Sequence, residues 1–473
     1  MADERKKSVA IVGGGITGLT IAYYLQKEIM SKRLNLEYKL FESSDKLGGK
    51  IQTDYTNGFV IEQGPDSFLA RKQSAAKLAR EVGLENELVH NDTGQSFVLK
   101  GDQLYPIPGG AIMGIPTKLA PFATTKLFSP MAKLRAAGDL FLPKTSQPDE
   151  DQSLGHFFRR RLGDEVVENL IEPLLSGIYA GDIDQLSLMA TFPQFHQVEQ
   201  KHRSLILGMS KVMPKPAKAV QPNKSRGMFM SFNGGLQSFV DSIENHLDED
   251  AVKKSVRVHS IMKEGEQYKL TFTDGQVEIF DRIILTTPHE VTSDILRNYS
   301  HIIQPLKEIP STSVATVAMA FPLSSIKGNL GGTGFVVAKN SGYSITACTW
   351  THKKWKHSAP EDYALLRCYV GRFGNDEIVS QSDDEILAAV KNDLNKIMKI
   401  DEPPQFHSIT RWKKAMPQYI VGHKQRIEML KTSLKKDMPG VYVAGAAYEG
   451  LGLPDCIDQG EAVVQNVVQS FEE

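Results

Sequence analysis

Cysteine is scarce in this chain. Cys348, Cys368 and Cys456 are the only three among 473 residues, they are widely separated, and no C-x-x-C pair occurs. This spacing argues against a disulfide framework, a zinc site and an iron–sulfur cluster. We therefore expect no metal site, and three buried free thiols in a reducing compartment.

Long apolar runs and an excess of charge are also missing. No apolar run approaches the roughly 18 residues of a membrane span, and the first predicted strand begins by about Ser8, which leaves no room for a cleavable signal. The formal net charge of −1 provides no basic field for a nucleic acid. These absences predict a soluble, cytoplasmic protein without a nucleic-acid partner. With 41% hydrophobic and 23% charged residues, the chain is expected to fold into two or three domains.

A glycine-rich turn lies near the start of the chain. The apolar run from 9 to 12 predicts a buried strand, and the segment from 16 to about 29 has helical periodicity. Between them, Gly13, Gly15 and Gly18 form a G-x-G-x-x-G pattern, which is typical of a turn that binds pyrophosphate at a helix N-terminus. A second predicted strand ends in Glu42, where an acid would bind a ribose. This context predicts a dinucleotide site but does not distinguish NAD from FAD.

Several turns and groups of cationic residues follow this segment. Gly48-Gly49-Lys50 places a cation after a glycine pair, as would suit a phosphate, and the turn of residues 64–68 precedes Arg71 and Lys72. The proline-rich stretch 101–143 suits a membrane surface, the cover of an apolar pocket, or short core helices. A helical pattern runs from 153 to 178, and the cationic stretch 201–226 is predicted to be a linker or lid.

The second half returns to strands. We expect strands near 256–261, 268–273 and 283–285 that rejoin the nucleotide-binding sheet, followed by a strand-rich block with a helix from 383 to 398. The chain then closes with a strand ending at Gly445, a turn over 450–454 and a helix from about Cys456 to Val468.

These segments together resemble the flavin amine oxidase superfamily over nearly the whole chain. The strings Glu62–Phe68, Glu172–Gly181 and Met416–Tyr419 are similar to porphyrinogen oxidases, and most of all to the soluble enzymes of Gram-positive bacteria that act on coproporphyrinogen III. The resemblance implies an α/β fold with a discontinuous Rossmann-like FAD-binding domain, a mixed-sheet substrate domain and a mainly helical subdomain. The implied boundaries are 1–75, 226–300 and 405–473 for the FAD-binding domain, 76–100 and 301–404 for the substrate domain, and 101–225 for the helical subdomain.

The resemblance also implies FAD as the cofactor, with the ribose on Glu42, the adenine against Val258 and the flavin near Trp412. Lys50 replaces the commoner arginine of the family, which keeps the charge but loses the bidentate contact. The implied cofactor contacts are Gly13, Gly14, Gly15, Ile16, Thr17, Gly18, Glu42, Ser43, Gly49, Lys50, Gly64, Pro65, Asp66, Ser67, Val258, Trp412, Gly445, Gly450, Leu451, Gly452, Leu453 and Pro454.

The implied activity is a six-electron oxidation of coproporphyrinogen III by oxygen, with hydrogen peroxide as by-product, within haem biosynthesis. The sequence has no Ser/His/Asp set and no H-E-x-x-H motif, in agreement with chemistry carried by the cofactor. Arg71 and Lys72 are the predicted partners of the substrate carboxylates, and Ile178 and Tyr369 the predicted apolar wall. Downstream haem-pathway enzymes and a weak peripheral membrane contact are the expected partners.

Three other readings stay open at this point. One is an oxidase of protoporphyrinogen IX, which has two carboxylates instead of four. Another is a flavin amine oxidase, with Trp412 and Tyr448 forming an aromatic cage. The last is a porphyrin carrier that holds FAD without catalysis.

Overall fold

The first strand of the chain lies in the middle of a five-stranded parallel sheet. The structure is a computed structural model that describes residues 5–92, 94–144, 147, 150–212, 227–327 and 331–472. The strand order is β12 (Val252–Lys253), β2 (Leu36–Phe41), β1 (Lys7–Val12), β16 (Arg282–Leu285) and β22 (Val441–Val443). Ile11 of β1 lies opposite Leu40 of β2 and Ile284 of β16. These strands are apolar on both sides, so both faces of the sheet must be covered.

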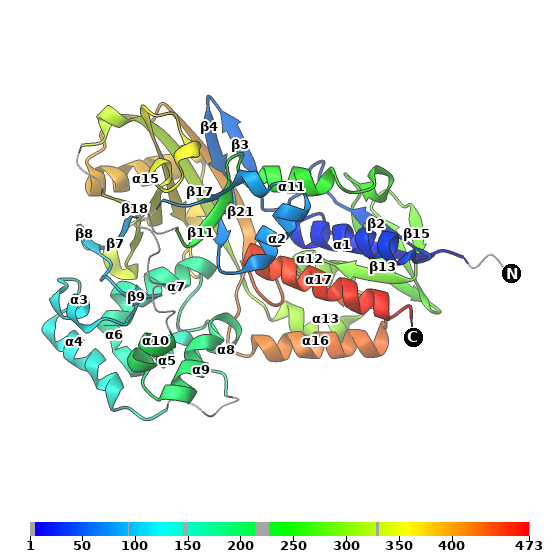
Figure 1. Cartoon of the computed structure of the whole chain (residues 1–473), viewed down its shortest axis with the longest axis horizontal. Helices are drawn as coiled ribbons and strands as arrows, with labels where there is room; N and C mark the ends of the chain where they lie inside the picture. Colours follow the sequence, from blue (N-terminus) through cyan, green and yellow to red (C-terminus); the bar gives the residue numbers. More distant parts are fainter. Residues whose placement is uncertain are drawn as a thin grey trace.

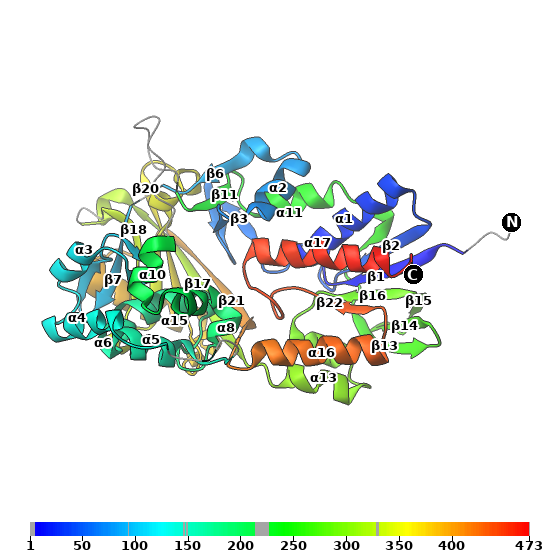
Figure 2. The same ribbon diagram turned by 60° about the horizontal axis from the view of Figure 1, so that its bottom comes forward.

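Alternate residues of β1 serve the two faces. Ile11 packs in a core cluster with the helices of one face, whereas Ala10 and Val12 belong to the cluster of the other face. Figure 2 shows these two layers on opposite sides of the sheet. The first layer contains α1 (Ile16–Lys32), α2 (Gln73–Glu81), α11 (Gln237–Glu244) and α17 (Leu453–Gln469). The second contains α12 (His289–Ile295), α13 (Ser300–Lys307), α16 (His423–Asp437) and the antiparallel sheet of β13 (Val258–Glu264), β14 (Gln267–Phe272) and β15 (Val277–Phe280).

The prediction that all strands between 256 and 285 rejoin the nucleotide-binding sheet is therefore wrong in part. Short hairpins connect β13 to β14 and β14 to β15, and such connections make antiparallel pairs. A parallel partner needs a longer crossover, and only β12 and β16 join the parallel sheet from this region.

A seven-stranded mixed sheet forms the other half of the molecule (Figure 1). Its order is β21 (Phe406–Pro417), β17 (Ser311–Pro322), β20 (Tyr363–Val370), β19 (Ile345–Trp350), β18 (Gly332–Val337), β7 (Gln95–Lys100) and β8 (Gln103–Pro106). Helix α15 (Asp383–Met398) begins at a capping box of Ser382 and Glu385 and packs on one face of this sheet. The other face is turned to the centre of the molecule.

A helical layer lies beside this second sheet. Phe157, Phe158, Leu170 and Phe195 are buried in its core. Gly163, at φ +85°, ends the helix that begins at Leu154, so the predicted helical stretch 153–178 is divided into several helices. The helices are α3 (Leu119–Thr124), α4 (Pro130–Ala137), α5 (Leu154–Leu162), α6 (Asp164–Val166), a π-helical turn (Val167–Ile171), α7 (Glu172–Tyr179), α8 (Leu188–Thr191), α9 (Pro193–His202) and α10 (Leu205–Val212). The predicted linker of 201–226 is thus helical for most of its length up to Val212, and 213–226 lie outside the described residues.

Short strands connect the main layers. They are β3 (Thr53–Thr56) with β4 (Phe59–Glu62), β5 (Phe68–Leu69) with β11 (Phe229–Phe232) and β6 (Leu88–His90), and β9 (Ala111–Ile112) with β10 (Ile115–Pro116); α14 (Thr351–Lys354) follows β19. The architecture confirms the predicted α/β fold, in which a Rossmann-like sheet built from separate segments is combined with a mixed sheet and a mainly helical part.

Candidate functional site

A cavity of about 1140 Å³ lies between the two large sheets. It begins at the glycine turn after β1, passes the edge strand β21 and its neighbours β17 and β20 in the second sheet, and extends to α7. Such a cavity is large enough for an extended dinucleotide and part of a second ligand.

The glycine turn is shaped for an anion. A Cβ atom on Gly18 would lie 1.9 Å from the carbonyl oxygen of Gly13, so only glycine lets α1 approach the turn this closely. Gly15 is the N-cap of α1, has φ −72° and makes no side-chain capping bond, and a Cβ there would meet nothing within 4 Å. The first N–H groups of α1 therefore border the cavity without a capping side chain, which is the arrangement that binds phosphate.

Glu42 fixes the edge of this turn. It follows β2 and lines the cavity. Its Oε2 accepts a hydrogen bond from the Gly14 amide at 2.7 Å, and its Oε1 accepts one from the Ser44 amide at 2.8 Å. The carboxylate is thus held beside the glycine turn, at the place where a dinucleotide ribose is bound in this type of fold.

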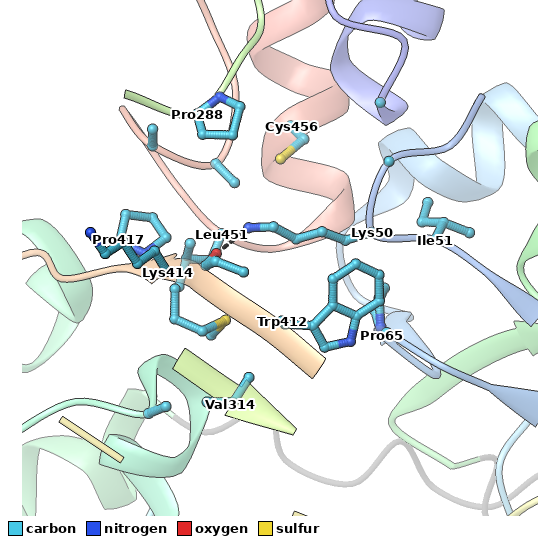
Figure 3. A pocket seen from close by; sticks show the side chains of 18 of the residues that line it. Lys50, Ile51, Pro65, Pro288, Val314, Trp412, Lys414, Pro417, Leu451 and Cys456 are labelled. Atoms are coloured by element: carbon cyan, nitrogen blue, oxygen red, sulfur yellow. Dashed lines mark hydrogen bonds between the residues drawn. The ribbon is translucent and has the colours of Figure 1, made fainter. Parts of the chain in front are cut away.

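Lys50 extends its side chain across the cavity. Its ammonium donates a hydrogen bond to the backbone oxygen of Ala415 in β21, and Figure 3 shows the side chain extended across the cavity towards that strand. Burial lowers the pKa of Lys50. The charge of Lys50 therefore lies inside the cavity, whose wall also includes Cys456 and Trp412 (Figure 3).

A second helix directs its N-terminus to the cavity. Gly452 is the N-cap of α17 and makes no side-chain capping bond. The turn before it is held by Tyr419, whose hydroxyl accepts from the Gly450 amide at 2.8 Å and donates to a backbone oxygen, that of Ala446, at 2.9 Å. His423 stacks on Tyr419 with ring centroids 3.9 Å apart. Two packed rings therefore position the turn, so that the partial positive charge of α17 acts on the cavity.

His423 itself is buried and neutral. Its Nε2 lies 2.8 Å from the carbonyl oxygen of Tyr448, which only accepts, so Nε2 carries the proton. Burial lowers the pKa of His423 to about 4. The stack therefore depends on an uncharged imidazole.

Residues 64–67 are held by charged groups. Asp66 pairs with Lys354 at 2.6 Å, and the guanidinium of Arg367 donates to the carbonyl oxygen of Gly64. Burial alone would raise the pKa of Asp66, but the charges of Lys354 and Arg367 hold it far below its usual value. Asp66 is thus ionised, and it connects this loop to α14 and β20.

The pKa of the nearby Glu62 is shifted in the opposite direction to that of Asp66. It accepts hydrogen bonds from the Leu236 amide at 2.6 Å and the Thr53 hydroxyl at 2.8 Å, yet burial raises the pKa of Glu62 to about 7. The indole of Trp412 donates to the carbonyl oxygen of Gln63 at 2.9 Å. Trp412 is thereby fixed as part of the cavity wall.

The helical end of the cavity contains the predicted apolar wall but not the predicted cations. Ile178 and Tyr369 both line the cavity, and Ile178 is half exposed. Arg71 and Lys72 do not line it: Arg71 is exposed, and Lys72 forms an ion pair with Asp455 in the first turn of α17. Asp455 lies in the same first turn of α17 as the cavity-lining residues Leu453 and Cys456.

Most of the predicted cofactor contacts line this one cavity. Those that do so are Gly13, Gly15, Ile16, Thr17, Glu42, Ser43, Gly49, Lys50, Gly64, Pro65, Asp66, Ser67, Val258, Trp412, Leu451, Gly452 and Leu453. Five do not line it, namely Gly14, Gly18, Gly445, Gly450 and Pro454. Gly14, Gly445 and Gly450 lie in turns next to lining residues, as the bond from Gly14 to Glu42 illustrates, and Gly18 and Pro454 lie in the first turns of α1 and α17. The chain therefore fits a bound FAD at its glycine end.

The sequence reasoning missed several polar residues of the wall. Lys339, Arg367 and Arg372 line the cavity, together with Glu172. Arg367 and Tyr369 are two positions apart in β20 and share a face, so strand alternation was a usable signal for Arg367. Lys339 and Arg372 lie in turns after β18 and β20, and no local pattern indicates where those turns lead.

The sequence profile of the flavin-containing amine oxidoreductases matches residues 16–468. The chain is 53% identical to the coproporphyrinogen III oxidase of Bacillus subtilis, with 98% of each chain covered. It is 44% identical to the coproporphyrinogen III oxidase of Staphylococcus aureus, over 98% of this chain and 99% of the relative. A crystal structure from Exiguobacterium sp. 255-15 superposes with a TM-score of 0.88 at 41% identity, over 98% of this chain and 99% of that one.

Proposed function

Because the chain belongs to the flavin-containing amine oxidoreductase family, we propose that it is an FAD-dependent oxidase that converts coproporphyrinogen III to coproporphyrin III. The observation that carries this proposal is the continuity of the cavity. One end has the features of a dinucleotide site, at Gly15 and Glu42, and the other has an apolar wall at Ile178 and Tyr369. A cofactor and a large tetrapyrrole would therefore meet inside one continuous space.

The residues of the chain would position the reactants. The N–H groups after Gly15 would bind the pyrophosphate, Glu42 would bind the ribose hydroxyls, and the N-terminus of α17 would stabilise negative charge on the reduced cofactor. FAD, when bound, supplies the two-electron acceptor and its reoxidation by oxygen. Over three rounds, one coproporphyrinogen III and three O₂ give one coproporphyrin III and three H₂O₂.

The substrate carboxylates need cations at the edge of the apolar space. Arg71 and Lys72 remain our proposed partners from the sequence. In the structure Lys72 is already paired with Asp455, so a propionate would exchange with that carboxylate. The pair lies beside α17, whose residues Leu453 and Cys456 line the cavity.

Anaerobic mixing of the holoenzyme with coproporphyrinogen III tests the proposal. Bleaching of the flavin absorbance band, followed by its return and by porphyrin fluorescence when oxygen is admitted, is the expected result. A flavin band that stays unchanged would reject the oxidase and favour a carrier. Parallel assays with protoporphyrinogen IX and with primary amines check the substrate class, and faster reduction by either would reject coproporphyrinogen as the preferred substrate.

We also propose that the enzyme works in the cytoplasm with a weak peripheral membrane contact. Three apolar side chains, Met131, Leu134 and Phe141, are 69 to 81% exposed on and just after α4. Figures 1 and 2 place α3 and α4 at the end of the molecule opposite the chain termini. Within the described residues, no helix combines the length and apolarity needed to cross a bilayer.

Sedimentation with anionic vesicles tests the contact. Binding that weakens when Met131 and Phe141 are both changed to serine is expected. If the wild-type protein stays in the supernatant at low salt, the contact is rejected.

A further inference from the structure

The turn after β20 carries Arg372, whose side chain has no hydrogen-bond or ion-pair partner among the described residues. Arg372 follows Gly371, which has φ +89°. The backbones of Arg372 and Asn375 are joined by two hydrogen bonds of 2.8 and 3.2 Å, and the Phe373 amide donates to the Ala180 carbonyl at 2.8 Å. The turn is therefore tight and attached to the loop after α7, so the place of Arg372 is well determined.

The guanidinium of Arg372 is half-buried in the cavity wall. Among the residues that the structure describes, no carboxylate lies within ion-pair distance of it and no group accepts a hydrogen bond from it. Burial lowers the pKa of Arg372, and the charge of Glu172 opposes that shift only in part. Removing a cation from water without a partner is unfavourable. The position is therefore suited to an anion that arrives in the cavity.

A second cation of the cavity wall is paired with Glu172. The Lys339 ammonium is 3.2 Å from Oε1 of Glu172 and 3.8 Å from Oδ1 of Asp182. Lys339 follows β18 and also lines the cavity. Glu172, in the first turn of α7, is buried, and its pKa is raised by burial although Lys339 lowers it. One carboxylate thus orients Lys339 and attracts Arg372, while two positive charges border the same space.

Two other cations of the cavity wall are bound to backbone carbonyl groups. Lys50 donates to the carbonyl oxygen of Ala415, and Arg367 donates to that of Gly64. Arg367 also stacks on Tyr369, with its guanidinium carbon 5.1 Å from the ring centroid. Arg372 and the partly exposed Lys339 line the same cavity as Ile178 and Tyr369.

We propose that Arg372 and Lys339 form a carboxylate-binding subsite that receives one propionate of the tetrapyrrole, with Glu172 holding Lys339 in place. This inference rests on the proposed function, because it takes a tetrapyrrole carboxylate as the ligand. The planar guanidinium binds a carboxylate with two parallel hydrogen bonds, and Lys339 adds a point charge. The tetrapyrrole ring would then lie against the apolar wall.

The test uses coproporphyrin III and its tetramethyl ester, titrated into the holoenzyme in one buffer and followed by porphyrin absorbance. Arg372→Ala is expected to weaken binding of the acid roughly ten- to hundredfold, as for a charged hydrogen bond, and to leave binding of the ester unchanged. Lys339→Ala should show the same pattern. Arg372→Lys should give an intermediate loss, because the charge remains and the bidentate geometry does not.

Two exposed residues outside the cavity provide matched controls, Arg160→Ala and Lys356→Ala. They remove the same charges and should leave both titrations at the wild-type values. Flavin content and the thermal midpoint establish that each variant is folded, and Arg372→Lys replaces Arg372→Ala if the alanine variant is not.

Equal losses for acid and ester, or no loss for either, would overturn the subsite. A wild-type protein that binds no coproporphyrin would also overturn it. If the acid-specific loss occurs but the wild type does not oxidise coproporphyrinogen III, the subsite stands and the proposed reaction fails. If turnover occurs and Arg372→Ala leaves acid binding unchanged, only the subsite fails.

Discussion

Replacing Gly15 by alanine should separate cofactor binding from folding. Gly15 has φ −72°, which alanine adopts without strain, and its added Cβ would meet nothing within 4 Å. The fold should therefore keep its stability, or gain about 0.5 kcal/mol from a stiffer unfolded chain. The open space beside Gly15 is where the pyrophosphate backbone contact is expected, so the methyl group should weaken FAD binding by about 2 kcal/mol, or roughly thirtyfold.

Gly18→Ala is the contrasting variant. Its Cβ would lie 1.9 Å from the Gly13 carbonyl oxygen, so the backbone must move, at a cost of about 1–3 kcal/mol. We expect this variant to unfold at a lower temperature even without flavin. Gly109→Ala provides the control, because its Cβ also meets nothing within 4 Å and it lies outside the cavity.

The assay has two readouts, FAD affinity from titration of the flavin-stripped protein and the thermal midpoint of that same protein. Gly15→Ala should change the first and not the second, and Gly18→Ala should change the second. Wild-type FAD affinity in Gly15→Ala, or a midpoint as low as that of Gly18→Ala, would refute the assignment of this turn to the pyrophosphate.

Three further predictions concern pH and substrate. The pKa of His423 is about 4 in the folded protein and 6.5 in the unfolded chain, so the unfolded state binds more protons between these pH values. The free energy of unfolding should therefore fall by about 3 kcal/mol as the pH drops from 6.5 to 4. His423→Gln should reduce this loss in urea titrations at pH 7 and 4.5, and an unchanged loss would exclude His423 as its source. The pKa of Glu62 is about 7 in the folded protein and 4.5 in the unfolded chain, so the free energy of unfolding should fall by about 3 kcal/mol as the pH rises from 4.5 to 7. Glu62→Gln should therefore be more stable than the wild type at pH 8 but not at pH 4.5. An equal gain at both pH values would count against a protonated Glu62. Arg71→Ala and Lys72→Ala should each raise the KM for coproporphyrinogen III about tenfold at unchanged flavin content, and an unaltered KM in both would remove these residues from the substrate site.

The parts of the site that follow local rules were accessible from sequence. The strand, glycine turn and helix over 9–29 need only apolar periodicity and three glycines, and the structure has β1, the turn and α1 in those places. Helix α15, predicted over 383–398, has these bounds because a capping box begins it. In both cases the determining contacts lie within a few residues of one another.

The wall at the helical end depends on contacts between distant segments. Arg372 reaches the cavity because its turn is bound to Ala180, almost two hundred positions earlier in the chain. Lys72 also depends on a distant segment. It lies close in sequence to the loop of residues 64–67, but its ammonium pairs with Asp455 of the last helix. Single-sequence patterns report neither pairing, because both are set by how separate segments pack.

The order of strands in the parallel sheet has a consequence for biosynthesis. β1 pairs with β16, whose first residue follows the last residue of β1 by 270 positions, and β22 completes the edge later still. At about 5–20 residues per second, the ribosome needs roughly 15 to 55 s to make that intervening stretch. During this interval the apolar edge of β1 has no partner in the emerging chain, and the turn before α17 has not been made. The glycine turn and the turn before α17, which both contribute to the cavity wall, can therefore come together only when nearly the whole chain has been made.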